Sequence, residues 1–256
     1  GPGDEHVGDI HRRAVAIRKE PDLDVVDQAD QQVGRELVDL VEIENGRMRL
    51  MVLPTRGMGI WRAETGDGQM LGWRSPVRGP VHPSFVPLHD PSGLGWLEGF
   101  DELVVRCGME SNGAPDFDAQ GKLLYPLHGR IANRPAHYVE ATVDERAGTI
   151  TLRGFVEETR FHFQKLRLEA SVTMSLDSMA FTICDRVENY GGTAAEMQML
   201  YHINVGEPQL GAGAALGTTV GAAGFSFSPL KRVTSRRFWA SMRLPGPSTM
   251  SVTLSC

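Results

Sequence analysis

The sequence predicts an all-β protein built from antiparallel strands, and three stretches carry that prediction. Apolar and polar residues alternate through residues 165–176. A period of two held over that length is typical of a half-buried antiparallel strand. Residues 179–183 and 195–203 repeat the pattern after short turns at 177–178 and 188–192. Successive strands joined by short turns form an antiparallel sheet, so the expected fold class is all-β.

Earlier in the chain the clearest signal is a hairpin. Residues 37–43 and 48–52 flank the dipeptide Asn45-Gly46. Asn-Gly between such segments favours a type I′ turn, because both central residues of that turn need a positive φ. Residues 1–34 are polar with weak periodicity, and they predict an N-terminal arm or leading strands.

Between the hairpin and the later strands, residues 56–96 are rich in Gly and Pro and hold several aromatic residues. A long irregular stretch with bulky aromatics usually forms a lid or the wall of a pocket. Residues 149–153 then predict a further strand, with Ile150 and Leu152 on one face.

The C-terminal part differs in composition. All 32 acidic residues lie at or before Glu207, and residues 209–256 carry basic side chains with poor alternation. We therefore expect a β-sandwich over 35–208 and an atypical basic segment over 209–256 that does not continue the sheet.

Composition restricts the partners and the compartment. A net charge of -6 argues against a nucleic-acid partner, since phosphate binding needs a basic surface. No apolar run approaches the roughly 18 residues of a membrane span, so no membrane partner is expected. Three widely spaced cysteines and no secretory signal pattern predict a reduced, cytoplasmic protein.

The densest group of chemically useful residues is the segment 125–134, which contains His128, Arg130, Asn133 and Arg134. It offers one side chain that titrates near neutral pH and several forked hydrogen-bond donors. That set suits a hydroxyl-rich ligand on which a proton must move. The alternative is a histidine with only a structural role.

A second histidine, His202, lies in the predicted strand 195–203. Alternation places it opposite Met199 and Tyr201, on a face with Gln198 and Asn204. Such a polar face either lines a ligand site or is simply solvated.

The segment 95–110 mixes aromatics with carboxylates. Trp96 offers a face for stacking a sugar ring, and Asp101 and Glu110 can accept hydrogen bonds from hydroxyls. Arg56 is a further candidate that either binds the ligand or pairs with a carboxylate. No metal site is predicted, because His82 and His89 lack a third ligand at a convincing spacing.

Three motifs in this order resemble the aldose 1-epimerase (galactose mutarotase-like) superfamily, and more closely its bacterial branch of aldose 1-epimerase-like proteins. They are Leu-His-Gly-Arg-Ile-Ala-Asn at 127–133, Asp-Arg-Val-Glu-Asn at 185–189 and Leu-Tyr-His-Ile-Asn-Val-Gly-Glu-Pro at 200–208. The resemblance covers roughly residues 35–208.

The resemblance implies an antiparallel β-supersandwich with a sugar-binding cleft, and an enzyme that interconverts sugar anomers without a cofactor. By matching motifs, His202 takes the role of proton donor and His128 holds the sugar beside it. Arg130 and Asn133 become binding residues, and Asp185 a structural one. The partner is then a small carbohydrate; the resemblance does not indicate an oligomeric state.

This chain departs from the family in one respect. The family's catalytic glutamate lies in a late strand, in a Gly-Leu-Glu-like context, and no carboxylate follows Glu207. A proton acceptor typically contributes about 10²–10⁴-fold in rate. The expectation is therefore weak mutarotase activity and an incomplete sheet, or a sugar-binding protein of the same fold without activity.

Overall fold

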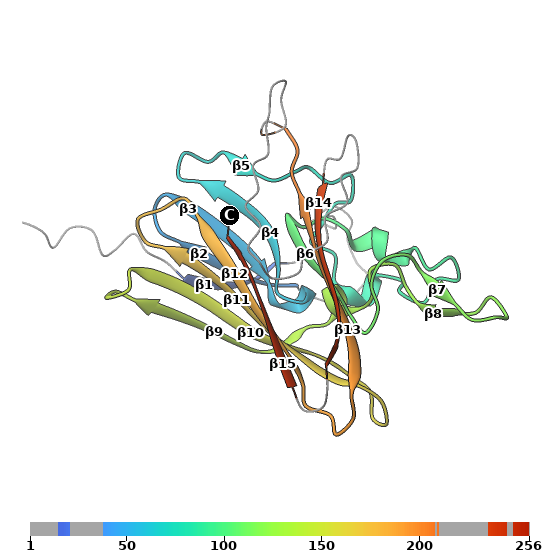
Figure 1. The fold of residues 1–256 in the computed structure, drawn as a ribbon. Coiled ribbons are helices and arrows are strands. Elements are labelled where there is room, and N and C mark those ends of the chain that lie inside the picture. The colour runs from blue at the N-terminus through green and yellow to red at the C-terminus, as the bar shows by residue number, and fades with distance from the viewer. Residues whose placement is uncertain (1–14, 21–37, 208, 210–234, 245–247, 256) are drawn as a thin grey trace, which may run out of the picture.

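The computed structural model describes residues 15–20, 38–207, 209, 235–244 and 248–255, and it is built almost wholly of antiparallel strands (Figure 1). One sheet has eight strands in the order β1-β2-β3-β4-β6-β13-β14, with β5 paired to β4. Its strands are β1 (Val15–Glu20), β2 (Val38–Glu44), β3 (Met48–Leu53), β4 (Gly59–Thr65), β5 (Met70–Leu71), β6 (Val104–Met109), β13 (Ala195–Asn204) and β14 (Ser235–Leu244).

A second sheet has five strands in the order β15-β12-β11-β10-β9, and a separate ribbon pairs β7 with β8. These strands are β9 (Ala136–Asp144), β10 (Thr149–Thr159), β11 (Lys165–Ser175), β12 (Phe181–Asn189), β15 (Ser248–Ser255), β7 (Asp116–Phe117) and β8 (Leu123–Tyr125). Short 3-10 helices occupy the loops: η2 (Pro54–Arg56), η3 (Pro83–Phe85), η4 (Gly95–Gly99) and η5 (Ile131–Asn133).

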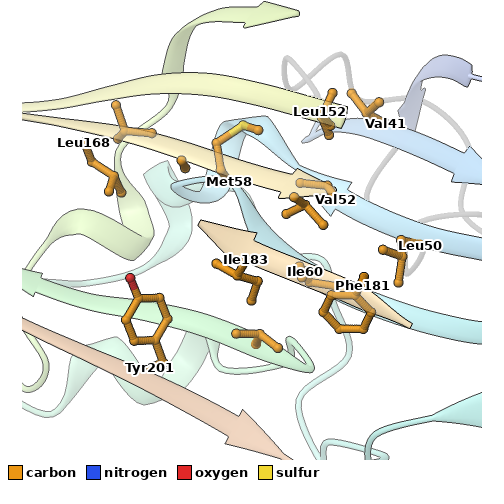
Figure 2. Packing of buried hydrophobic residues seen from close by; sticks show 14 of the residues in the cluster. Val41, Leu50, Val52, Met58, Ile60, Leu152, Leu168, Phe181, Ile183 and Tyr201 are labelled. Carbon is orange, nitrogen blue, oxygen red and sulfur yellow. The ribbon is translucent and has the colours of Figure 1, made fainter. Parts of the chain in front are cut away.

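The predicted fold class is confirmed, and the alternation in the sequence is the reason. Along β11, buried and half-buried residues alternate without a break, as they do along most of β10. In the central described strands, apolar side chains of the two sheets are buried against one another. Val52 and Ile60 of the first sheet meet Leu168 and Ile183 of the second in one continuous core (Figure 2).

A buried ion pair links the two sheets inside this core. The Arg106 guanidinium of β6 donates to both carboxylate oxygens of Asp185 on β12, at 2.6 and 3.0 Å. Tyr201 of β13 donates its hydroxyl to the same carboxylate at 2.8 Å. Burial, and then the neighbouring Asp185 charge, raise the pKa of Tyr201 well above its usual range, so the phenol stays a donor. Asp185 thus has the structural contacts that the resemblance implied.

The predicted hairpin is present, but its turn is not type I′. Gly46 has φ 80°, but Asn45 does not have a positive φ, which in the described ranges only Met58 and His128 have among residues other than glycine. Asn45 instead accepts hydrogen bonds from the backbone N–H groups of Arg47 and Met48. Its amide nitrogen donates to the carbonyls of Ser175 and Ser178, so this turn also ties the two sheets together.

Two expectations about irregular segments were wrong in part. The beginning of the stretch 56–96 is not irregular, because β4 pairs there with β3. Within 209–256, β14 pairs with β13 and β15 pairs with β12, so this segment contributes a strand to each sheet despite its poor alternation. The three-part division of the chain stays a prediction. Of the N-terminal arm, β1 pairs with β2, and the rest lies outside the described residues.

None of the helices in the described part of the chain has the length and apolar character needed to cross a membrane.

The ion pair between the sheets generates a stability prediction. Asp185→Ala leaves the buried Arg106 cation without its partner, which typically costs about 3–5 kcal/mol. We expect the free energy of unfolding, measured by urea denaturation, to fall by about that amount. Glu188→Ala on the same strand is the control, because its half-exposed pair with Arg167 at 3.7 Å is worth less than about 1 kcal/mol. Equal losses for both variants would contradict this account.

Candidate active site

His128 lies on a loop whose backbone is fixed against β6. Its carbonyl accepts from the N–H of Gly108 at 3.0 Å, and the N–H of Arg130 donates back to the carbonyl of Gly108 at 2.9 Å. His128 itself has φ 59°. A left-handed conformation is uncommon for residues other than glycine and often marks a site where geometry matters more than local stability.

Gly129, which follows, cannot carry a side chain. It has φ 72°, and a Cβ there would lie 2.2 Å from the carbonyl oxygen of Ser111 and 2.3 Å from that of Gly108. The close approach of this loop to β6 therefore requires glycine. It also fixes where the His128 ring can point.

His202 reaches the same place from β13, where it pairs in register with Val105 of β6. Tyr201 and Met199 point into the core, and His202 lies on the opposite face, as the alternation predicted. The rings of His128 and His202 lie edge to face with centroids 5.7 Å apart, and the two residues are only 4% and 5% exposed. The structure therefore brings the two predicted histidines together.

Aromatic side chains cover this histidine pair. Trp96 of η4 packs against His128 with ring centroids 4.8 Å apart, and Phe100 packs against His202 at 4.7 Å. The two aromatic rings contact each other at 4.8 Å. Trp96 is only 1% exposed, so its indole forms the wall behind His128 and has no open face for a sugar. The expected covering role of the long loop is what the structure shows.

Arg56 has the second of its two predicted roles. Its Nε lies 2.5 Å from Glu102, and its Nη2 donates to the carbonyl of Gly99 at 2.7 Å. Its Nη1 donates to the Asn133 Oδ1 at 2.9 Å and to the carbonyl of Val81 at 3.0 Å. This buried guanidinium therefore holds loops together, and nothing in its contacts supports a role in binding a ligand.

A pocket of about 430 Å³ is lined in part by Arg130, Asn133 and Arg134, which follow His128 in the chain. Its polar lining includes three residues predicted to bind ligand, Glu110, Arg130 and Asn133, but neither histidine. Asp101 is also outside this lining; it accepts a hydrogen bond from the Trp61 indole at 2.5 Å, and burial raises its pKa. The predicted residues thus divide between a covered histidine pair and an open polar pocket.

Glu158 is the lining residue that sequence reasoning missed. It is 3% exposed, and its Oε2 accepts from the backbone N–H groups of Met109 at 2.7 Å and Glu110 at 3.2 Å. Burial raises the pKa of this carboxyl above its ordinary value of 4.5, although the two N–H groups act in the opposite direction. A signal was present: Glu158 continues the apolar face of β10 after Leu152 and Val156, where a charged residue is out of place.

No group of three or more His, Cys, Asp or Glu side chains in the described ranges could hold a metal ion. His82 accepts a hydrogen bond from the backbone of Ser84, and His89 lies at the edge of the pocket.

The raised pKa of Glu158 makes a testable prediction about stability. Because the folded state holds this proton more tightly than the unfolded state, folded stability decreases as pH rises above 4.5 through the raised folded pKa. Glu158→Gln keeps an acceptor for the two N–H groups and removes the titration. We expect the melting temperature of this variant, relative to the unmodified protein, to increase between pH 4 and 8. The exposed Glu145→Gln control should show no such trend, and a constant difference for Glu158→Gln would count against a buried, titrating carboxyl.

The geometry can be set beside known proteins. Among solved structures, a Klebsiella pneumoniae protein provisionally assigned as an aldose 1-epimerase is 33% identical with a TM-score of 0.62. The match covers 76% of this chain and 52% of that one, so the present chain spans about half of its length. A galactose mutarotase-like protein from Clostridium acetobutylicum is 13% identical, with a TM-score of 0.47 and coverage of 74% and 54%. One from Lactobacillus casei is 16% identical, with a TM-score of 0.43 and coverage of 65% and 50%.

No protein with a curated functional description matches the chain. The family model described as a domain of unknown function, DUF4432, matches residues 35–248, well past the point at which the motif resemblance ended. The chain therefore belongs to the DUF4432 family, and it has the galactose mutarotase-like β-sandwich fold of the Klebsiella protein.

Proposed function

We propose that this protein binds a sugar and interconverts its anomers by acid–base ring opening, as an aldose 1-epimerase does. The observation that carries the proposal is the pair His128 and His202, which two distant segments bring to a ring separation of 5.7 Å on one face of the sheet. The Klebsiella relative supports it through its fold and its assigned activity.

In this mechanism His202 donates a proton to the ring oxygen while the bond between that oxygen and the anomeric carbon breaks. The anomeric hydroxyl loses its proton to a base, the carbonyl forms, and ring closure on the other face reverses each transfer. Histidine suits the donor role because its pKa lies near neutral pH. His128 holds the sugar beside it. Only protons move, so the proposal needs no cofactor.

The mechanism also needs a residue that accepts the proton of the anomeric hydroxyl. Glu110 and Glu158 line the pocket, whereas Asp101 does not, so the first two are the carboxyl groups to test as proton acceptors. The cytoplasmic location expected from cysteine usage belongs to the proposal too.

A second function, sugar binding without turnover, has an observation in its favour. Both histidines are almost completely buried under Trp96 and Phe100, and neither lines the pocket. A ligand seated in the pocket alone would meet binding groups and no proton donor.

Anomer exchange on freshly dissolved sugars, followed by NMR, separates the two functions. If His202 is the general acid, His202→Ala should reduce the catalysed rate by about 10²–10⁴-fold and change sugar affinity much less. His137→Ala on β9 is the control, because that histidine is exposed and lies in the other sheet. Calorimetric binding of a sugar with no catalysed exchange would favour the binding protein, and an unchanged rate in His202→Ala would refute the proposed acid.

A further inference from the structure

We propose that the polar pocket binds an oxyanion, so that the substrates of this protein are sugars carrying a carboxylate or a phosphate. That the ligand is a sugar rests on the proposed function, whereas its negative charge is inferred from the pocket alone. Its volume of about 430 Å³ lies in the usual range for small-molecule sites.

The first argument is a donor without an acceptor. Asn133 is 7% exposed, and its Nδ2 has no hydrogen-bond partner in the described part of the chain. Its orientation is not arbitrary, because Arg56 can only donate and therefore holds the Oδ1 of Asn133 at 2.9 Å. An unpaired N–H donor is thus held in one orientation on a residue of the pocket lining. A buried donor left unsatisfied costs about 1–3 kcal/mol, and a ligand acceptor would remove that cost.

The second argument concerns the cations. Arg130, Arg134 and Arg160 all line the pocket. The Nε of Arg130 is buried and has no hydrogen-bond partner among the described residues. Arg134 and Arg160 are exposed and form no ion pair with any residue that the structure describes, and Arg160 is stacked over the Phe163 ring at 4.5 Å. Guanidinium groups with unused N–H donors bind carboxylate and phosphate well, because two parallel N–H groups match two oxygens of the anion.

The third argument is the balance of charge in the pocket, where two of the carboxylate oxygens are already held by the protein itself. The Oε2 of Glu158 accepts two backbone N–H groups, and the Oε1 of Glu110 accepts the Tyr125 hydroxyl at 3.0 Å. The other Glu110 oxygen lies 3.8 Å from Arg130. Three arginines against two glutamates leave an excess of positive charge in the lining, which an anionic ligand would balance.

The pocket is also placed to act on the same ligand as the histidines. Arg130 follows His128 by two residues, so their Cα atoms are at most about 7.6 Å apart. The hydrogen bonds to Gly108 on both sides of this turn fix that relation. An acidic group held by the arginines would therefore lie beside the turn that carries His128, although neither histidine ring lines the pocket itself.

The test is calorimetry on the full chain with galactose, galacturonate, galactose 6-phosphate and inorganic phosphate. The proposal expects at least one acidic sugar to bind about tenfold more tightly than galactose, the difference that one charge-assisted hydrogen bond provides. The better of the two acidic sugars identifies the anion as carboxylate or phosphate. Equal or tighter binding of galactose, or no binding of any of the four, would overturn it.

Variants locate the anion. Arg134→Gln combined with Arg160→Gln should weaken the acidic sugar about tenfold and leave galactose unchanged. Asn133→Asp should weaken it as well, because the variant still accepts from Arg56 but presents an oxygen in place of Nδ2. Arg146→Gln is the control, because Arg146 is exposed in the turn between β9 and β10 and does not line the pocket. If the double variant binds the acidic sugar as tightly as the unmodified protein, the pocket is not the anion site.

Anomer exchange distinguishes this inference from the proposed function. Tight, arginine-dependent binding of an acidic sugar without catalysed exchange would uphold the pocket assignment and defeat the epimerase proposal. If neutral and acidic sugars exchange anomers at equal catalysed rates, and the arginine variants do not change those rates, the epimerase proposal is upheld and the pocket assignment fails.

Discussion

The loop layer above the eight-stranded sheet depends on one buried cation, Arg56. Its hydrogen bonds reach the carbonyl of Val81, the segment from Gly99 to Glu102 between η4 and β6, and Asn133 in η5, and these three segments are far apart in the sequence. A buried guanidinium is costly unless every N–H group finds an acceptor, so these segments are held in one arrangement. Through that arrangement Arg56 positions the Trp96 wall behind His128 and orients the Asn133 amide in the pocket.

In the sheet beneath these loops, successive side chains of a strand point to opposite faces, so one strand contributes both to the core and to the candidate site. On β13, Tyr201 joins the buried Asp185 network in the core, while the next residue, His202, faces the site. On β6, Arg106 joins the same network, and Cys107 packs with Trp96 on the site face. A shift of register by one residue would exchange these faces, so the ion pair that holds the sheets together also fixes which side His202 takes.

The fold was predictable because a period of two is a local signal, and β10 to β13 occur where it was strongest. The family motifs around His128 and His202 predicted that the two residues lie together, whereas the alternation of apolar and polar residues did not. Glu158 was missed, and the role of Arg56 stayed open between two alternatives, because both roles arise from contacts with residues about fifty positions away. The strands β14 and β15 lack a clear pattern of their own, and their place is given only by pairing with β13 and β12.

The separation between the histidine pair and the pocket makes sense if anchoring and proton transfer are done by different side chains of one loop. The histidines are packed among aromatic rings, where water is excluded and a proton donor is held in one orientation. Arginines in such surroundings would be costly to bury, and they lie instead at the open pocket. An anion bound there contributes binding energy remote from the reacting carbon, and that energy can position the anomeric centre for reaction. On this view the short, rigid turn from His128 to Arg130 sets the distance between anchor and chemistry, and therefore which sugars fit.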